Sequence, residues 1–252
     1  MSNKGNNGGK VRLDVLVSEL GHRRGFAKEL IQNGNVKVGG VTITSPGASF
    51  AKSEVNIECD IPGKVYVSRG GYKLEHALKH FEINASGLIC ADIGASTGGF
   101  TDCLLENGAK KVYAVDNGNG QLDKKLFNDA RVINMENVNA KYLKLDMFPD
   151  IIDFICIDVS FISVTKIIYV LNDILKPGGE IICLIKPQFE AGKNAANKRG
   201  IVKNVKSHEN AIKLVQSTFL EYKFNMVGYI KSPITGLGGN IEYLAYFSKV
   251  II

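Results

Sequence analysis

The chain has 252 residues, of which 45% are apolar and 22% charged, and its net charge is +6. This composition is ordinary for a globular protein and leaves room for one large domain and one small one. No apolar run reaches the roughly 18 residues of a membrane helix, since Asp153 and Asp158 interrupt the best candidate, residues 151–162. Residues 1–10 are polar and glycine-rich, lack an apolar signal segment, and are predicted to be disordered.

The basic charge and the cysteines narrow the class further. Seven Lys and Arg against three Asp and Glu give residues 1–40 a net charge of +4, which suggests a polyanionic partner, although a solvated helix face has the same signature. The five cysteines are odd in number, and no two have the spacing of metal ligands. Three of them lie in apolar runs, so we expect a reduced, cytoplasmic protein without a metal site.

Residues 11–61 are predicted to form a small α+β domain. Helical spacing of apolar residues recurs at 12–20 and 23–34, with Gly34 placed to end the second helix. Two short alternating segments around Gly39 and Gly40 predict a hairpin. A further strand is expected within 51–61, and a linker at 62–67.

Residues 68–252 alternate short apolar runs with helical stretches, which predicts a doubly wound α/β domain. Nearly continuous apolar runs predict parallel strands buried on both faces at residues 88–94, 111–116, 131–136, 151–158 and 180–186. Two more strands, at 226–232 and 242–248, follow a long helix without another helix between them. A mostly parallel sheet with an antiparallel last strand is typical of Rossmann-like class I methyltransferases and unlike NAD-binding dehydrogenases.

A glycine-rich turn, ADIGASTGGF at residues 91–100, joins the first of these strands to a helix. Gly94, Gly98 and Gly99 would let a ligand approach the backbone, but their spacing is not that of a dinucleotide site. The carboxylate of Asp92 would repel a pyrophosphate, whereas it would pair with the ammonium or sulfonium of S-adenosyl-L-methionine. The turn alone is weak support, because a structural glycine turn with capping acids looks similar.

Acidic residues also end the next two strands. Asp116 is placed to accept hydrogen bonds from ribose hydroxyls, and Glu136 and Asn137 are placed to line an adenine pocket. Together with the turn, these residues favour a methyl-donor site.

Four charged residues are expected to meet at the carboxyl edge of the sheet. Asp158 and Lys186 end adjacent strands, Glu242 begins the antiparallel last strand at the same edge, and Lys73 lies on the helix leading into the domain. A ribose hydroxyl is a poor nucleophile until a base removes its proton. Lys186 is predicted to be that base, oriented by Asp158 and Glu242. Lys73 is predicted to hold ribose or phosphate and to favour neutral Lys186; the alternative is two structural ion pairs.

The segment after the fourth strand, DVSF, bears on which atom is methylated. It is not the Asn-Pro-Pro-aromatic clamp of base-amine methylation, and no Pro-Cys pair follows, as carbon-5 methylation would need. Both absences favour methylation at oxygen.

Motifs spread from about residue 11 to 248 resemble the TlyA family, whose members are named both haemolysins and 2′-O-ribosyl rRNA methyltransferases. The motifs are RLD, VSRGGYKLE, DIGASTGGFTDCLL, NGNGQLDKKLFNDARV, DVSFIS, KPQFE and SPITGLGGNIEYL. The resemblance implies an S-four RNA-binding domain followed by an FtsJ-like methyltransferase domain, with a catalytic tetrad on Lys73, Asp158, Lys186 and Glu242. It places the methyl-donor motif on Asp92, Gly94, Ala95, Ser96, Thr97, Gly98, Gly99 and Phe100, with Asp158 near the sulfonium.

The resemblance also implies a substrate, the cytidine ribose of ribosomal RNA. The chain ends ten residues after Glu242, without the extension of dual-specificity members, so large-subunit (23S) rRNA is expected and small-subunit (16S) rRNA stays open. We expect a cytoplasmic monomer that binds rRNA or ribosomal subunits, not DNA. The residues expected to contact RNA, mainly at its phosphates, are Arg12, Arg23, Arg24, Lys28 and Arg69.

Three alternatives are weaker. An RNA-binding assembly factor with a silent site conflicts with the intact tetrad. A membrane-active haemolysin lacks a secretion signal and an apolar hairpin. An NAD-dependent oxidoreductase conflicts with the spacing of the glycines and with the terminal strand pair.

Overall fold

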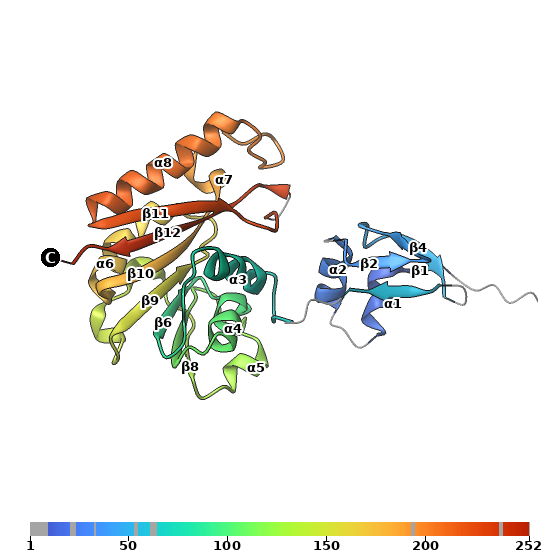
Figure 1. Cartoon of the computed structure of the whole chain (residues 1–252), viewed down its shortest axis with the longest axis horizontal. Coiled ribbons are helices and arrows are strands. Elements are labelled where there is room, and N and C mark those ends of the chain that lie inside the picture. Colours follow the sequence, from blue (N-terminus) through green and yellow to red (C-terminus); the bar gives the residue numbers. More distant parts are fainter. Residues whose placement is uncertain are drawn as a thin grey trace, which may run out of the picture. The chain divides into compact units, whose positions relative to one another are not determined.

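The computed structural model describes residues 10–20, 24–32, 34–52, 55–60, 65–192, 195–236 and 239–251. They form two compact units that divide between Val65 and Tyr66 (Figure 1). The tail expected to be disordered, most of the expected linker, and Arg23 lie outside the described residues.

The smaller unit packs two helices, α1 (Leu13–Ser18) and α2 (Arg24–Gln32), on short antiparallel strands. Its strands form a three-stranded sheet of order β3-β2-β5 and a separate β1-β4 pair. The strand bounds are β1 (Lys10–Arg12), β2 (Val36–Val38), β3 (Val41–Thr42), β4 (Ser49–Ala51) and β5 (Ile57–Cys59). The two predicted helices and the hairpin are confirmed, whereas the β1-β4 pair was not predicted.

The end of α2 follows the predicted glycine stop. Gly34 has φ +77° and donates to the Ile31 carbonyl, and Asn35 donates to the Leu30 carbonyl. Both bonds satisfy carbonyls that the last helical turn leaves unpaired. The apolar face of α2 packs with Leu13, Val17 and Val36 in the core of the unit.

The larger unit is built on a seven-stranded sheet of order β11-β12-β10-β9-β6-β7-β8. Five strands are parallel: β6 (Ile89–Ile93), β7 (Lys111–Val115), β8 (Val132–Met135), β9 (Ile152–Ile157) and β10 (Leu175–Ile185). The last strand, β12 (Tyr243–Lys249), runs antiparallel between β10 and β11 (Phe224–Lys231). The predicted doubly wound sheet with its antiparallel end is confirmed, and the strand order reverses between β6 and β9.

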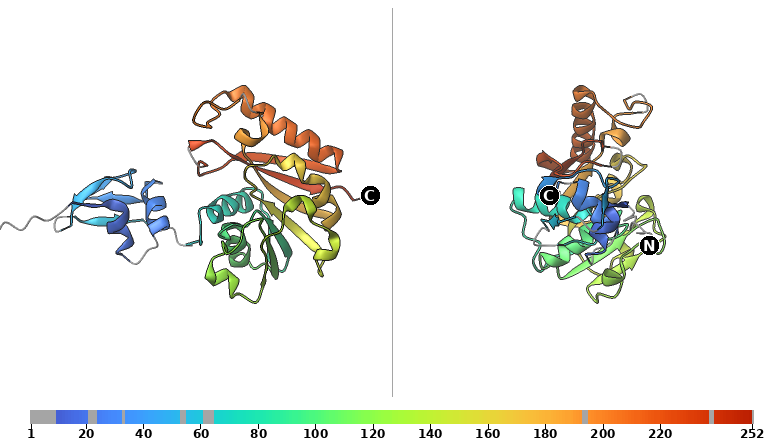
Figure 2. Two further views of the ribbon diagram at one scale, coloured as in Figure 1. Left: turned by 180° about the vertical axis from the view of Figure 1, so that it is seen from behind. Right: turned by 90° about the vertical axis from the view of Figure 1, so that its right-hand side faces the viewer.

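Helices cover both faces of this sheet (Figures 1 and 2). One apolar cluster contains Ile155 and Ile157 of β9, and the other contains Phe154 and Cys156, so this strand is buried on both faces as predicted. The helices are α3 (Gly70–His80), α4 (Gly99–Glu106), α5 (Lys124–Phe127), α6 (Ile168–Ile174), α7 (Pro187–Glu190) and α8 (Val205–Glu221), with 3₁₀ turns η1 (Ala140–Tyr142), η2 (Leu145–Met147) and η3 (Val164–Lys166). In the part of the chain that is described, no helix combines the length and the apolarity that crossing a membrane requires.

Tyr66 and Val67 pack into the larger unit, although the sequence predicts a linker at 62–67. The Tyr66 ring is buried and meets Tyr72 edge-on, with ring centroids 5.2 Å apart. A Cβ on Gly71 would lie 2.2 Å from Tyr66 Cγ, so only glycine lets the ring lie against α3. The flanking Pro62 and Gly63 suggest a linker, but the aromatic residue after them is part of a core.

Candidate active site

Lys186 and Asp158 form an ion pair at the carboxyl edge of the sheet. Asp158 follows β9 directly and Lys186 follows β10 directly, and these strands are neighbours. Lys186 Nζ lies 2.5 Å from Asp158 Oδ1 and 2.7 Å from Ser160 Oγ. Lys186 is only 7% exposed, and Pro187 after it begins α7. The apolar strand therefore ends on a lysine that is held by the end of the next strand.

Lys73 and Glu242 form a second buried pair. Lys73 lies in the first turns of α3, and its Nζ is 2.6 Å from Glu242 Oε2. β10 and β12 pair Ile185 with Tyr243, so continuing this register sets Glu242 opposite Lys186. The predicted set of four residues thus meets at one edge of the sheet. Glu242 pairs with Lys73, however, and not with Lys186 as the sequence predicts.

Asp92 is fully buried at the end of β6. Its Oδ2 accepts hydrogen bonds from the backbone N–H of Thr101 at 2.9 Å and from the Thr101 hydroxyl at 2.7 Å, while Oδ1 has no hydrogen-bond partner. Burial, reinforced by the nearby charge of Asp158, raises the pKa of Asp92 to about 7. The sequence predicts that Asp92 pairs directly with a ligand; in the structure its contacts hold the first turn of α4.

The glycines of the turn are crowded by the protein itself. A Cβ on Gly94 would lie 2.5 Å from the Asp158 carbonyl, and a Cβ on Gly98 would lie 2.2 Å from Leu126 Cδ1. The same atom on Gly99 would lie 2.2 Å from Ser68 Oγ. The sequence predicts that these glycines make room for a ligand. Their absent side chains instead let the turn pack against Asp158, α5 and the segment before α3.

Asp116 fixes the outer part of the turn. Its Oδ2 accepts from the backbone N–H of Ser96 at 2.8 Å and its Oδ1 from that of Gly118 at 2.6 Å. Ser96 is exposed and has φ +49°, whereas Ala95 and Phe100 are buried. The Thr97 carbonyl accepts from the backbone N–H of Asp123. Each Asp116 oxygen keeps a further lone pair with which to accept a hydrogen bond.

Glu136 and Asn137 lie beside the next loop. Glu136 accepts from the backbone N–H groups of Gln121 at 2.9 Å and Leu122 at 3.5 Å. Backbone donors, that of Gly120 first, lower the pKa of Glu136 and favour its carboxylate form. Asn137 is exposed with φ +59°.

Asp116, Glu136 and Asp158, all partly exposed, therefore offer acceptors along one edge. This donor set fits S-adenosyl-L-methionine, which brings an ammonium, a sulfonium and ribose hydroxyls.

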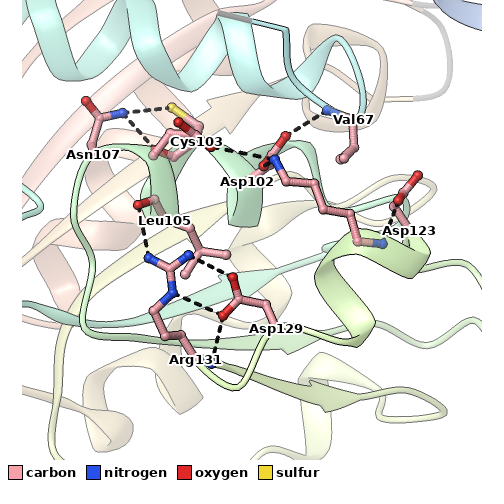
Figure 3. Close-up of polar contacts among 10 residues, drawn as sticks. Val67, Asp102, Cys103, Leu105, Asn107, Asp123, Asp129 and Arg131 are labelled. Atoms are coloured by element: carbon pink, nitrogen blue, oxygen red, sulfur yellow. Dashed lines mark hydrogen bonds and ion pairs between the residues drawn. The ribbon is translucent and has the colours of Figure 1, made fainter.

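A further buried carboxylate, Asp102, ties the elements behind the turn together (Figure 3). Its Oδ2 accepts from the backbone N–H of Val67 and its Oδ1 from Lys125 Nζ, each at 2.8 Å. The hydrogen bond to Asp102 raises the pKa of Lys125. The residues before α3 are thereby fixed to α4 and to α5.

Three of the predicted RNA-contacting cations converge on Asp14, which is buried in α1. Nitrogens of Arg12, Arg24 and Lys28 lie 2.9, 3.3 and 4.0 Å from its carboxylate oxygens. The hydrogen bond from Arg12 is the main cause that lowers the pKa of Asp14. Arg23 is outside the described residues, and Arg69 lies in the larger unit at the N-cap of α3.

The sequence did not identify two site residues that follow Asp158. Ser160 holds Lys186, and the Phe161 ring is 91% exposed, although exposure is unusual for Phe. Phe161 has φ +64°, a strained conformation for a bulky side chain. Its ring lies 5.7 Å from that of Phe189, which in turn lies 6.0 Å from Lys186 Nζ. The DVSF motif was the signal, but it was used only to exclude other chemistries.

A doubly wound sheet with an antiparallel strand inserted at one end, and acids at its carboxyl edge, defines the class of Rossmann-like methyltransferases. The chain matches the family of FtsJ-like methyltransferases over residues 66–249 and the S4 domain over residues 11–49. It therefore belongs to the FtsJ-like methyltransferase family and carries an S4 domain ahead of the methyltransferase domain.

Relatives agree with the TlyA resemblance. Hemolysin A of Brachyspira hyodysenteriae is 45% identical, over 94% of this chain and 99% of its own. The 16S/23S rRNA (cytidine-2′-O)-methyltransferase TlyA of Mycobacterium tuberculosis is 34% identical, over 94% and 88%. The 23S rRNA (cytidine-2′-O)-methyltransferase TlyA of Campylobacter jejuni is 34% identical, over 95% and 100%. The predicted family is confirmed.

Solved structures agree with the fold. A protein from Streptococcus thermophilus, described as a hemolysin, superposes with a TM-score of 0.76 at 42% identity and covers 96% of this chain and 89% of its own. An S-adenosylmethionine-dependent methyltransferase from Listeria monocytogenes gives 0.53 at 16% identity, over 71% and 98%, and shows the same sheet architecture.

Proposed function

We propose that this methyltransferase transfers a methyl group from S-adenosyl-L-methionine to the 2′-hydroxyl of a cytidine ribose in ribosomal RNA, with large-subunit rRNA as the main substrate. The observation that carries the proposal is the pair of ion pairs at the carboxyl edge. Four charged residues spread over 169 positions of the chain meet where a parallel sheet binds its ligand. The names of the Mycobacterium and Campylobacter relatives support the choice of substrate.

Lys186 is the general base in this proposal. The methyl donor supplies an electrophilic methyl group on a sulfonium. Lys186 Nζ takes the proton of the 2′-hydroxyl as the oxygen bonds to the methyl carbon, and the proton stays on the amine. Asp158 and Ser160 contact this nitrogen, so they hold it in place and stabilise the ammonium that forms.

The remaining groups hold the reactants. Asp116 and Glu136 accept hydrogen bonds from the hydroxyl and amine donors of the methyl donor. Lys73 offsets the charge of Glu242, so that the carboxylate opposite Lys186 is paired in the buried site. The S4 domain binds RNA through Arg12, Arg24 and Lys28, and Arg69 contributes from the larger unit.

A transfer assay tests the proposal. Purified protein is incubated with tritiated S-adenosylmethionine and with separated ribosomal subunits, from a strain lacking the enzyme. Label in 2′-O-methylcytidine of large-subunit RNA is the expected result, and label in small-subunit RNA as well would widen the substrate. Donor binding without label in either subunit would favour a catalytically silent RNA-binding factor.

The hemolysin names make membrane activity the second candidate. A dye-leakage assay on liposomes with the same protein separates the two. Methyl transfer without leakage is expected. We further propose that the enzyme acts as a monomer in the cytoplasm, where its substrate is assembled, and size-exclusion chromatography with light scattering tests the monomer.

A further inference from the structure

The segment between α7 and α8 concentrates positive charge. Residues 191–208 contain no Asp or Glu, whereas four exposed cations fall within nine positions, at Lys198, Arg199, Lys203 and Lys206. None of the four forms an ion pair with a residue that the structure describes. Residues 41–252 carry a net charge of only +2, so this segment is far more basic than its surroundings. The site described above gives these cations no role.

The segment begins with a tightly bonded turn. The Asn197 side-chain oxygen accepts from the backbone N–H groups of Arg199 at 2.8 Å and Ile201 at 3.0 Å. The Asn197 backbone closes the turn, since its N–H donates to the Ile201 carbonyl and its carbonyl accepts from Gly200. Lys198 and Arg199 lie at the tip of this turn, so their positions are fixed by the backbone.

The turn is anchored to the strand that carries Glu242. The buried Asn240 side chain donates to the Gly200 carbonyl and accepts from the Val202 N–H, both at 3.0 Å. His208, also buried, bonds the Val202 carbonyl at 2.9 Å and the Tyr243 hydroxyl at 3.2 Å. Residues on both sides of Glu242 thus hold the basic turn, at the end of the sheet where β11 leads into β12 (Figures 1 and 2).

We propose that Lys198, Arg199 and Lys203 form a phosphate-binding surface of the methyltransferase domain, which holds the RNA backbone next to the target ribose. The inference rests on the function proposed above. An internal nucleotide has a phosphate on each side, so an RNA strand whose ribose reaches Lys186 continues past the residues beside it. Exposed, unpaired cations fixed there are complementary to that backbone.

The test compares two full-length double variants of equal charge. Lys198→Ala/Arg199→Ala removes the tip of the turn, and Lys110→Ala/Lys213→Ala removes two exposed cations from the amino edge of the sheet and from α8. Binding to large-subunit rRNA is measured over a range of salt concentrations. Each lost phosphate contact reduces the slope of log affinity against log salt by roughly 0.7–0.9. The first variant should therefore lose about 1.5 in slope, and the second should keep the wild-type slope.

Donor binding by calorimetry, expected to be unchanged in both variants, shows that the fold is intact. Equal losses in the two variants would overturn the proposal, because net charge alone would then explain them, and so would an unchanged slope in the first. If the wild type binds rRNA but transfers no methyl group, the proposed function fails while the slopes still decide the surface. Loss of binding to vesicles containing phosphatidylglycerol, with RNA binding intact, would assign the turn to a membrane and overturn the RNA reading.

Discussion

At the scale of single residues, the buried carboxyl of Asp92 makes stability depend on pH. Its pKa is raised to about 7 by burial, against an ordinary value of 3.8. Between these values the folded protein retains a proton that the unfolded chain has released. The free energy of unfolding therefore falls as pH rises from about 4 to 7, by an amount on the order of a few kcal/mol.

Asp92→Asn should remove this dependence. The amide oxygen still accepts from Thr101, but the side chain no longer titrates. The variant is expected to gain stability relative to the wild type between pH 5 and pH 8. Denaturant unfolding at the two pH values measures the difference, and parallel curves for the two proteins would contradict the assignment.

Lys186→Ala should reduce methyl transfer by roughly 10²–10⁴-fold, the range expected for a lost general base. Lys186→Arg is the matched control, because arginine keeps the positive charge next to Asp158 but does not accept a proton, and it should be equally inactive. Initial rates are measured with donor binding by calorimetry, which should persist in both. Normal turnover in either variant would refute the role of Lys186.

The exposed, strained Phe161 is placed to stack on a nucleotide base. Phe161→Ala should raise the KM for RNA about tenfold, since stacking contributes roughly 1–3 kcal/mol per base, and should leave donor affinity unchanged. Phe161→Tyr keeps the ring and should restore the KM. A KM that does not move in Phe161→Ala would show that the ring has no contact with RNA.

At the scale of elements, the packing of α3 depends on a missing side chain. Gly71→Ala would force a Cβ to within 2.2 Å of Tyr66 Cγ, and such overpacking costs about 1–3 kcal/mol. Gly70→Ala, one position earlier, meets its nearest atom, Phe100 Cδ1, at 3.3 Å and should cost less than about 1 kcal/mol. Thermal unfolding of both variants tests the order, and equal melting temperatures would argue against it.

The elements predicted from sequence are those with a long periodic signal. The five parallel strands are buried on both faces, so their apolar runs are nearly continuous, and α8 has many turns over which its pattern repeats. The strands β1 and β4 have three residues each and alternate too briefly to be recognised. Tyr66 was assigned to a linker because its partner Tyr72 lies in a later helix.

The site was predictable where strand ends determine it. Asp158, Lys186 and Glu242 follow or precede strands, and sheet geometry brings such positions together. The partners of each residue were not predictable, because they depend on side-chain direction: Glu242 pairs with Lys73, and Asp92 with Thr101. The packing of Gly94 against Asp158 likewise depends on backbone positions that no local pattern encodes.

At the scale of the whole molecule, each of the two units should affect a different step. Asp14 gathers three cations in the S4 domain, so Asp14→Asn adds a positive charge yet should weaken rRNA binding, because the cations are no longer held together. Glu19→Gln is the matched control: Glu19 pairs with Lys52 at 2.9 Å, and its loss adds the same charge without dispersing the cluster. Filter binding to rRNA measures the effect.

Donor binding, which belongs to the larger unit, should be unchanged in both of these variants. A gain in rRNA affinity in Asp14→Asn equal to that in Glu19→Gln would mean that net charge, and not the arrangement around Asp14, sets the affinity.

The position of β12 has a consequence for synthesis. Ribosomes build the chain from its amino end, so β10 and β11 emerge before the strand that lies between them. Until residues 242–249 follow, β10 has an open edge where β12 belongs, and Lys73 has no carboxylate beside it. A nascent chain can therefore hold Asp158 and Lys186 together but not the complete set, and the catalytic edge closes only late in translation.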